Sequence, residues 1–328
     1  MEQLSVRNRL GKILEMKEMG IIIPTVIFVI VVQIINPVFL SADNFLNVLR
    51  ATAFTLITAL GMTLVLVSGG LDLSVGSVLA VGTVITGMAL TAEMPIPIAI
   101  AIGIGSGLLL GLANGIIIVK FKIPPLIMTL GMLYIARGIV YILTQGVPVY
   151  PLPQAFQAIE QEDVFGIPKV AIIVAVMAIV FVFILKKTTF GRKVYAIGGN
   201  RETARLAGIN INKTYVLIYA ITGALAAFTG VMQASRLGSG EPSAGNGYEL
   251  TVIAAAIIGG TSTYGGSGTI LGTVIGALFM NIMTNSMVLM KVSVYWQNLV
   301  IGCILVLAVI IDQANRDRQL RRAIKANS

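Results

Sequence analysis

Apolar segments of nearly constant length follow one another along the whole chain, with only short polar connections between them. A helix needs about 20 apolar residues to cross the hydrocarbon core of a bilayer, and about ten segments approach that length, with 249–264 marginal. They lie near 20–40, 53–70, 74–92, 96–119, 124–144, 168–186, 214–233, 249–264, 268–290 and 294–312. Since 56% of the 328 residues are hydrophobic and 11% charged, a water-soluble fold could not bury this apolar surface. We expect an all-α, polytopic membrane protein with about ten transmembrane helices.

The residue types that are missing exclude several kinds of chemistry. The chain has no His and a single Cys, Cys303, so a His- or Cys-based metal site, a disulfide within the chain and a His-assisted nucleophile are all excluded. No G-x-x-x-x-G-K-[ST] loop is present to hold ATP. A net charge of +9 could indicate nucleic acid, but Lys and Arg lie between the apolar segments and at the two ends. We expect no cofactor on this chain and no nucleic-acid partner.

The distribution of charge in the connections predicts the orientation of the chain. The tail before residue 20, the connection at Lys120 and Lys122, the loop 186–213 and the C-terminal tail are basic, whereas the loop 145–168 is acidic. Basic connections stay in the cytoplasm, which places both termini there and requires an even number of spans. We therefore expect a cytoplasmic segment 1–19, a transmembrane domain 20–312 and a basic cytoplasmic tail 313–328. No A-x-A-like site follows the first apolar segment, so we interpret it as an uncleaved span and not as a signal peptide.

An internal repeat marks two glycine-rich stretches. Residues 69–87 match residues 259–277 without a gap at eight of nineteen positions, which suggests two related halves. Three of the glycine pairs that match in this alignment would break the helices: Gly69, Gly70 and Gly76 in the first stretch, and Gly259, Gly260 and Gly266 in the second. Helices broken at corresponding places of two halves are typical of the solute path of a transporter, because irregular backbone at membrane depth requires protein or water around it.

Polar residues within this apolar chain are candidates for the solute path. Asp72, with Ser74 close behind it, could cap the helix that follows, contact a solute directly, or lie in an ordinary loop at the membrane surface. If there are ten spans, this turn lies on the cytoplasmic side. Arg137 is costly inside a span. It could extend outward to the membrane surface, face a polar cavity and hold hydroxyl groups, or pair with backbone carbonyls or a carboxylate. Asn281 is a weaker candidate, since such side chains often join neighbouring helices.

The loop 186–215 predicts a short helix outside the membrane. Asn200 can cap the helix RETARLA, Glu202 suits the dipole of its first turn, and Gly208 can end it in a left-handed conformation. A helix of about two turns is unstable alone in water. It must therefore dock, either on anionic lipid through its basic residues or on a partner protein.

The same loop resembles the coupling segment of ATP-binding-cassette importer permeases, whose pattern is E-A-A, three residues, then G. Glu202, Ala204 and Gly208 match this pattern, while Thr203 replaces the first Ala and the later Leu-Pro is missing. Four longer segments resemble, in order, the ribose-type sugar permeases of that class: SGGLDLSVGS, KIPPLIMTLGMLYIARG, FGRKVYAIGGNRETARLAGIN and IGGTSTYGGSGTILGTVIGAL. This resemblance covers nearly the whole chain from the second span onward. The related branched-chain amino-acid permeases lack the run from Asp72 to Gly76, which favours sugar.

The resemblance implies a homodimeric permease in a bacterial-type inner membrane, with a separate extracytoplasmic sugar-binding protein and a separate ATPase that holds ATP-Mg. The chain itself would then be a transport subunit and not an enzyme. The residues that couple to the ATPase would be Asn200, Arg201, Glu202, Ala204, Arg205 and Gly208. Two rival functions stay open from the residues alone. An ion-driven secondary transporter needs ionisable groups at mid-membrane, and a membrane-embedded enzyme needs acid–base or metal chemistry.

Overall fold

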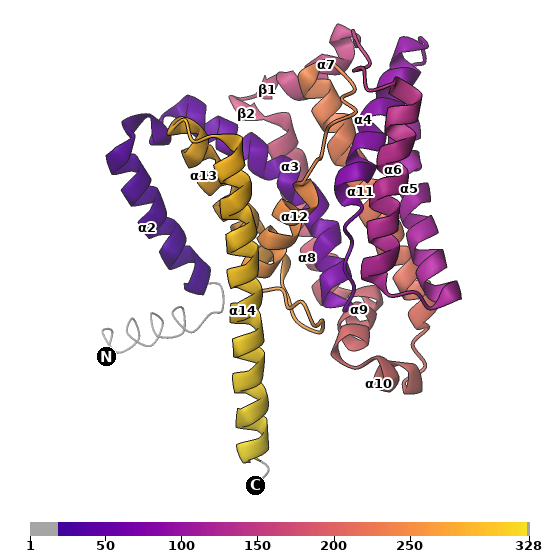
Figure 1. Ribbon diagram of the computed structural model, residues 1–328, viewed down its shortest axis with the longest axis vertical. Helices are drawn as coiled ribbons and strands as arrows, with labels where there is room; N and C mark the ends of the chain where they lie inside the picture. Colours follow the sequence, from indigo (N-terminus) through magenta and orange to yellow (C-terminus); the bar gives the residue numbers. More distant parts are fainter. Residues whose placement is uncertain (1–18, 327–328) are drawn as a thin grey trace.

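The structure, a computed structural model, describes residues 19–326 and is built from helices that run roughly along one axis (Figure 1). Within these residues, seven helices are long and apolar enough to cross a membrane. They are α3 (Ala42–Val67), α5 (Ile96–Phe121), α6 (Pro125–Thr144), α8 (Lys169–Lys187), α11 (Ile211–Leu237), α13 (Ile270–Leu289) and α14 (Val294–Ala326). Three shorter apolar helices are α2 (Met19–Ile35), α4 (Val75–Thr91) and α12 (Tyr248–Ile258). Each apolar segment of the sequence thus carries a helix, and the all-α, polytopic prediction is confirmed.

The centre of the molecule is formed by α3 and α11. In the most apolar stretch of 18 residues in α3 and in α11, 83% and 72% of the residues are buried, respectively. Helix α11 packs against α5, α4 and α3. Close packing with α5 depends on a row of glycines, because a Cβ on Gly107 would overlap the Gly223 carbonyl and a Cβ on Gly111 would overlap that of Tyr219. Small residues of this kind let helices approach each other in lipid, where packing replaces the hydrophobic effect.

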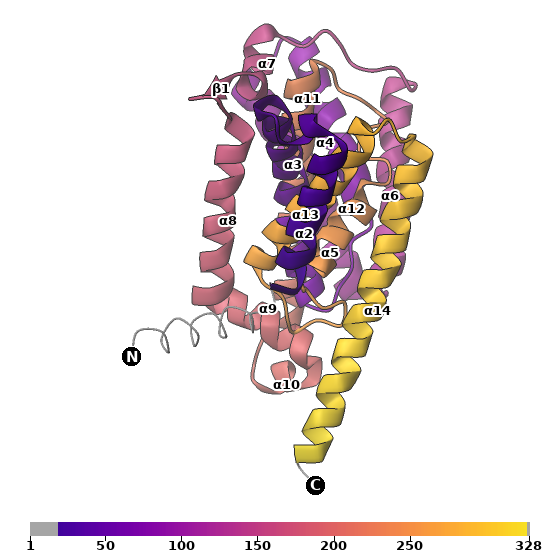
Figure 2. The same ribbon diagram turned by 90° about the vertical axis from the view of Figure 1, so that its left-hand side faces the viewer.

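The last helix, α14, has the opposite character. No residue in its most apolar stretch of 18 residues is buried, and its main partner among the described helices is α12. Large apolar side chains such as Trp296, Leu299 and Ile310 are exposed on it. The helix continues without a break to Ala326 (Figure 2), so the backbone of 313–326 extends the last span. Residues 1–18, most of the predicted cytoplasmic N-terminal segment, lie outside the described residues.

Small elements lie at the two ends of the bundle (Figures 1 and 2). One end carries α7 (Gln154–Gln161) and a hairpin of β1 (Asp163–Val164) and β2 (Ile167–Pro168), with η1 (Pro37–Leu40) connecting α2 to α3. Arg50 of α3 pairs with Glu160 at 2.9 Å and with Asp163 at 2.7 Å. Burial raises the pKa of Glu160, and the neighbouring Arg50 opposes that rise. This ion-pair group holds α7 and the hairpin onto α3.

The opposite end carries α9 (Thr189–Gly199) and α10 (Arg201–Leu206). The sequence predicted α10 but no helix before it. The hydroxyl of Thr188 caps α9 by accepting a hydrogen bond from the Gly191 amide at 3.2 Å. The prediction missed α9 because its polar and glycine-rich sequence carries no apolar run.

Candidate functional site

The span that contains α4 is broken before that helix begins. Helix α3 ends in a Schellman turn, in which Gly69 adopts φ +78°. The amides of Gly69 and Gly70 donate to the carbonyls of Leu66 and Val65 at 2.8 and 2.9 Å. The chain then runs without helix to Val75, beside α6 (Figure 1). Leu71 and Leu73 are half-buried whereas Asp72 and Ser74 are buried, the alternation expected of extended backbone.

Helix α12 ends in the same turn, shifted by one residue relative to the ungapped alignment. Gly260 adopts φ +84°, and the amides of Gly260 and Thr261 donate to Ile257 and Ala256 at 2.8 and 3.0 Å. The equivalent of Gly69 is therefore Gly260 and not Gly259, the residue that the alignment paired with it. The expected break at Gly76 is also wrong, because Gly76 lies in the first turn of α4.

Gly266, the other glycine of that aligned pair, lies in the loop before α13, with φ +76°. A local turn can recur while the spacing to the next helix drifts, which an ungapped comparison cannot show.

Asp72 does not cap α4. The cap position is Ser74, without a side-chain capping bond, whereas Asp72 Oδ1 accepts from the amide and hydroxyl of Ser74 at 2.9 and 2.6 Å. The Ser74 hydroxyl in turn accepts from Asn114 Nδ2 at 3.0 Å. The carboxylate satisfies the nearest amide and not those of the first turn. Asp72 is 1% exposed, which also excludes the surface-loop interpretation. Its direct contact with a solute stays a prediction.

Arg137 pairs with backbone carbonyls, the third of the alternatives that the sequence left open. Its Nη1 donates to the carbonyls of Pro242 and Ala244, both at 2.8 Å, and Glu249 lies within electrostatic range. The arginine therefore holds the non-helical connection between α11 and α12. Asn281 joins two helices, since its Nδ2 donates to Thr55 of α3 at 3.0 Å. The roles of both residues in the solute path remain predictions.

Replacing Arg137 with Leu is expected to lower the stability of the protein in detergent by about 2 kcal/mol or more, because two carbonyls lose a charged donor. Arg137→Lys is the matched control, since it keeps the positive charge. Its single ammonium group replaces the planar guanidinium and can bond at most part of the pair of carbonyls. Thermal unfolding of the purified variants measures the difference. Equal midpoints for Arg137→Leu and the parent would contradict the tethering role.

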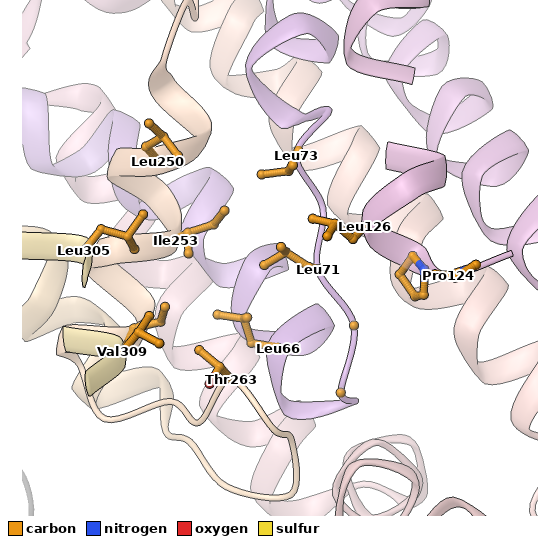
Figure 3. A pocket seen from close by; sticks show the side chains of 14 residues that line it. Leu66, Leu71, Leu73, Pro124, Leu126, Leu250, Ile253, Thr263, Leu305 and Val309 are labelled. Atoms are coloured by element: carbon orange, nitrogen blue, oxygen red, sulfur yellow. The ribbon is translucent and has the colours of Figure 1, made fainter. Parts of the chain in front are cut away.

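A groove of about 380 Å³ lies beside the broken span. Figure 3 shows Leu71, Leu73 and Leu126 on one side, facing Leu250, Ile253, Leu305 and Val309 on the other. One wall is thus the extended segment with the start of α6, and the other is α12 with α14. The full lining is Leu66, Gly69, Gly70, Leu71, Leu73, Pro124, Pro125, Leu126, Leu250, Ile253, Ile257, Thr263, Leu305 and Val309. Asp72, Ser74, Arg137 and Asn281 are not part of it.

The short helix α10 has the caps that the sequence predicts. Asn200 Oδ1 accepts from the Thr203 amide at 2.9 Å, Gly208 adopts φ +77°, and the amide of Ile209 donates to Ala204 at 3.1 Å. Only Ala204 of this helix is buried. Glu202 and Arg205 form an exposed ion pair at 2.9 Å, and Leu206 is 83% exposed. The helix thus presents an outward surface with an unburied leucine.

The end of α9 lies against the two places where the chain leaves a helix inside the bundle, the end of α3 and the loop after α12. These are the ends of the two broken spans. A Cβ on Gly198 would overlap the carbonyl oxygen of Val67 and come within 2.5 Å of the Gly266 amide nitrogen. That amide donates to Val67 at 2.8 Å, and the Tyr195 hydroxyl donates to Gly268 at 2.7 Å. We call this contact of Gly198, Val67 and Gly266 the glycine junction. It connects the helix before α10 to the turn after α3 and to the loop after α12.

The same loop is also attached to α14. The carboxylate of Asp312 accepts from the amide and the hydroxyl of Thr263 at 3.0 and 2.9 Å. The guanidinium of Arg316 stacks 4.0 Å from the ring centroid of Tyr264. The otherwise unburied α14 is therefore held at this end by specific polar contacts.

A bundle of apolar helices, with spans that break beside a groove and a capped helix exposed at one end, defines a multi-pass membrane protein of the permease class. The family model of the branched-chain amino acid transport system / permease component matches residues 44–309, and the chain belongs to this family. As a permease component it is a transport subunit of the bacterial inner membrane and not an enzyme. The resemblance that the sequence motifs suggested is confirmed.

Named relatives are similar over most of their length. The ribose import permease protein RbsC of Haemophilus influenzae is 40% identical over 88% of this chain and 91% of its own. The probable ABC transporter permease protein YphD of Escherichia coli is 37% identical over 90% and 89%. The xylose transport system permease protein XylH of Haemophilus influenzae is 34% identical over 85% and 91%. No solved structure matches the chain.

Sequence reasoning missed the groove and the glycine junction. Leu250, Ile253 and Ile257 recur at the spacing of one helical face, which is a signal, but such a face is usually core. Gly198 and Gly199 are adjacent in the sequence, and only the packing of α9 distinguishes them. Both features depend on contacts between segments that are far apart in the chain.

Proposed function

We propose that this chain is the membrane-spanning subunit of an ATP-driven importer that translocates a monosaccharide, either a ribose-like pentose or a hexose. A separate extracytoplasmic binding protein delivers the sugar, and a separate ATPase holds ATP-Mg. Two copies of the chain form the complete permease. The names of the relatives, for ribose and xylose import and for an ABC transporter, support this proposal. The observation that carries it is the outward surface of α10.

The α10 surface fits a protein partner better than a lipid surface. Its helix of six residues is too short to be stable alone, and its two caps keep it in shape. Glu202 and Arg205 pair with each other, so the two arginines and one glutamate of the six-residue helix leave a net charge of +1 for anionic lipid. Leu206 offers an apolar anchor for a protein partner. In the proposed contact with the ATPase, the buried Ala204 seats the helix on the permease. The exposed residues Asn200, Arg201, Glu202, Arg205 and Gly208 meet the partner.

The orientation follows from this assignment. The end with α9 and α10 carries the basic loop 186–213 and faces the cytoplasm, and α14 extends beyond the bundle at the same end (Figure 2). The end with α7 and the acidic loop 145–168 faces outward, where the binding protein docks. Both termini are therefore cytoplasmic.

The proposed mechanism is a two-state change of access. Nucleotide binding and hydrolysis move α10, and the glycine junction passes that movement to the ends of both broken spans. A ligand shifts an equilibrium only through different affinities for its two states. The ATPase supplies that difference by binding α10 differently with and without nucleotide.

Two rivals remain to be tested against this function. An ion-driven transporter needs a titrating group that faces its path, whereas Asp72 is hydrogen-bonded to Ser74 and lies outside the groove lining. An amino-acid permease of the same family would carry a substrate with an ammonium and a carboxylate group. The groove lining contains no charged side chain to pair with either.

The decisive experiment is reconstitution of the permease with its ATPase and binding protein in proteoliposomes. We expect a monosaccharide such as ribose or xylose to raise ATP turnover and to accumulate inside the vesicles only when all three components are present. Leucine tests the amino-acid alternative in the same assay. Uptake that follows an imposed proton or sodium gradient, without nucleotide or partner chains, would overturn the proposal.

A further inference from the structure

The geometry points to the groove beside the broken span as an aqueous part of the sugar path, with the backbone of residues 69–71, which lines the groove, as its hydrogen-bonding surface. This inference rests on the proposed function, because the sugar is the solute that the path would carry. It assigns the path to main-chain groups and not to the polar side chains that the sequence singled out.

The first step is the hydrogen-bond inventory of the extended segment. The amide of Leu73 donates to Thr129 Oγ1 at 3.1 Å, and the carbonyl of Leu71 accepts from the hydroxyl of Tyr219 at 3.2 Å. Within residues 19–326, no protein partner is found for the amide of Leu71 or for the carbonyls of Gly69 and Gly70, and all three residues line the groove. One donor and two acceptors of adjacent peptide groups are thus left without protein partners.

The second step is the depth of this segment in the bundle. Its partner Thr129 lies one turn after the start of α6 at Pro125. Asn114, which holds Ser74, lies about 10 Å along α5 from the end of that helix at Phe121, at 1.5 Å per residue. The segment therefore runs from the end of the bundle into its interior, and its unpaired groups lie on the first part of that course. Hydrocarbon cannot satisfy such groups, and irregular backbone persists at membrane depth only against protein or water.

The third step is the chemistry of the walls. Apart from Thr263, every side chain that lines the groove is apolar or is that of glycine. An ion or an amino acid would find no charged side chain there. A monosaccharide is neutral, and its hydroxyls both donate and accept, which suits one amide and two carbonyls. Its C–H faces can contact the leucines opposite, and few directional bonds allow fast release.

The alternative occupant of such a groove is a lipid acyl chain, and the chain offers a direct way to separate the two. Its single cysteine, Cys303, can be replaced by Ser to give a parent without thiols. Leu71→Cys and Leu250→Cys, from opposite walls (Figure 3), then place one thiol each in the groove. Both side chains are partly exposed, so the loss of volume costs little. Ile135→Cys, at an exposed position on α6, is the matched control for a lipid-facing thiol.

The experiment measures the rate of labelling by a charged methanethiosulfonate, and by lipid-soluble N-ethylmaleimide, in membranes that contain the complete transporter. Thiolates form in water. We expect the charged reagent to modify both groove cysteines at least tenfold faster than Ile135→Cys. If both react as slowly as the control while N-ethylmaleimide still labels them, the groove is filled by lipid and the inference is wrong. If only one wall variant folds, that variant decides the result.

The labelling result and the proposed function can fail separately. ATP-dependent sugar uptake by the Cys303→Ser parent tests the function and needs no groove variant. If this parent shows no ATP-dependent sugar uptake while the charged reagent still labels the groove cysteines quickly, the importer assignment is overturned and the groove is still aqueous. Normal sugar uptake with slow labelling would keep the importer and overturn the path.

Discussion

Replacing Gly208 with Asp is expected to abolish ATP-driven sugar uptake while leaving the amount of permease in the membrane unchanged. Gly208 adopts φ +77°, a conformation that costs most other residues roughly 1–2 kcal/mol. A Cβ there would meet no atom within 4 Å, so the fold itself tolerates a side chain. The new carboxylate would lie at the C-terminal end of α10, where the helix dipole disfavours negative charge. The last turn of α10 would open on the surface that the ATPase contacts.

Gly208→Asn is the matched control for this variant. Asn is nearly the same size as Asp, accepts the left-handed conformation more readily than most residues and carries no charge. We expect it to keep at least half of the parent uptake rate, whereas Gly208→Asp falls below a tenth. Uptake in membrane vesicles, together with the amount of ATPase that co-purifies, measures both. Normal uptake by Gly208→Asp would count heavily against the coupling role of α10.

The second large effect is expected at the glycine junction, where Gly198→Ala should reduce uptake at least tenfold. The new methyl group would overlap the Val67 carbonyl and press on the Gly266 amide. Backbone atoms cannot swing aside like a flexible side chain, so either α9 or the turn after α3 must shift. Overpacking of this kind costs about 1–3 kcal/mol, and the displaced elements are the ones that connect α10 to the broken spans.

Gly199→Ala provides the control, because the adjacent glycine has no atom within 4 Å of an added Cβ. Both changes add one methyl group to the same helix and raise its intrinsic propensity equally. We expect Gly199→Ala to retain uptake within twofold of the parent, with an unchanged melting temperature in detergent. Equal uptake by the two variants would show that the junction plays no part in transport.

Local chemistry explains what the sequence could predict. Apolar length alone located the helices, since the bilayer sets that length. Asn200 and Gly208 marked the ends of α10 because a cap acts within three or four residues of itself.

The candidate site was less accessible, because its elements meet only after folding. A cap on α4 was one of the three roles that the sequence left open for Asp72, but Ser74 lies closer and donates to its carboxylate. The groove joins residue 71 to residues 250 and 305, and no short-range pattern predicts that meeting. A search for polar side chains also could not find a surface made of main-chain atoms.

The hydrogen bond from the Gly266 amide to the Val67 carbonyl, seated against Gly198, joins the loop after α12 directly to the end of α3. Under the proposed mechanism, a displacement of α9 would therefore act on both segments at one contact. The two halves of the chain would then change conformation together, because moving one of these segments alone must break this bond.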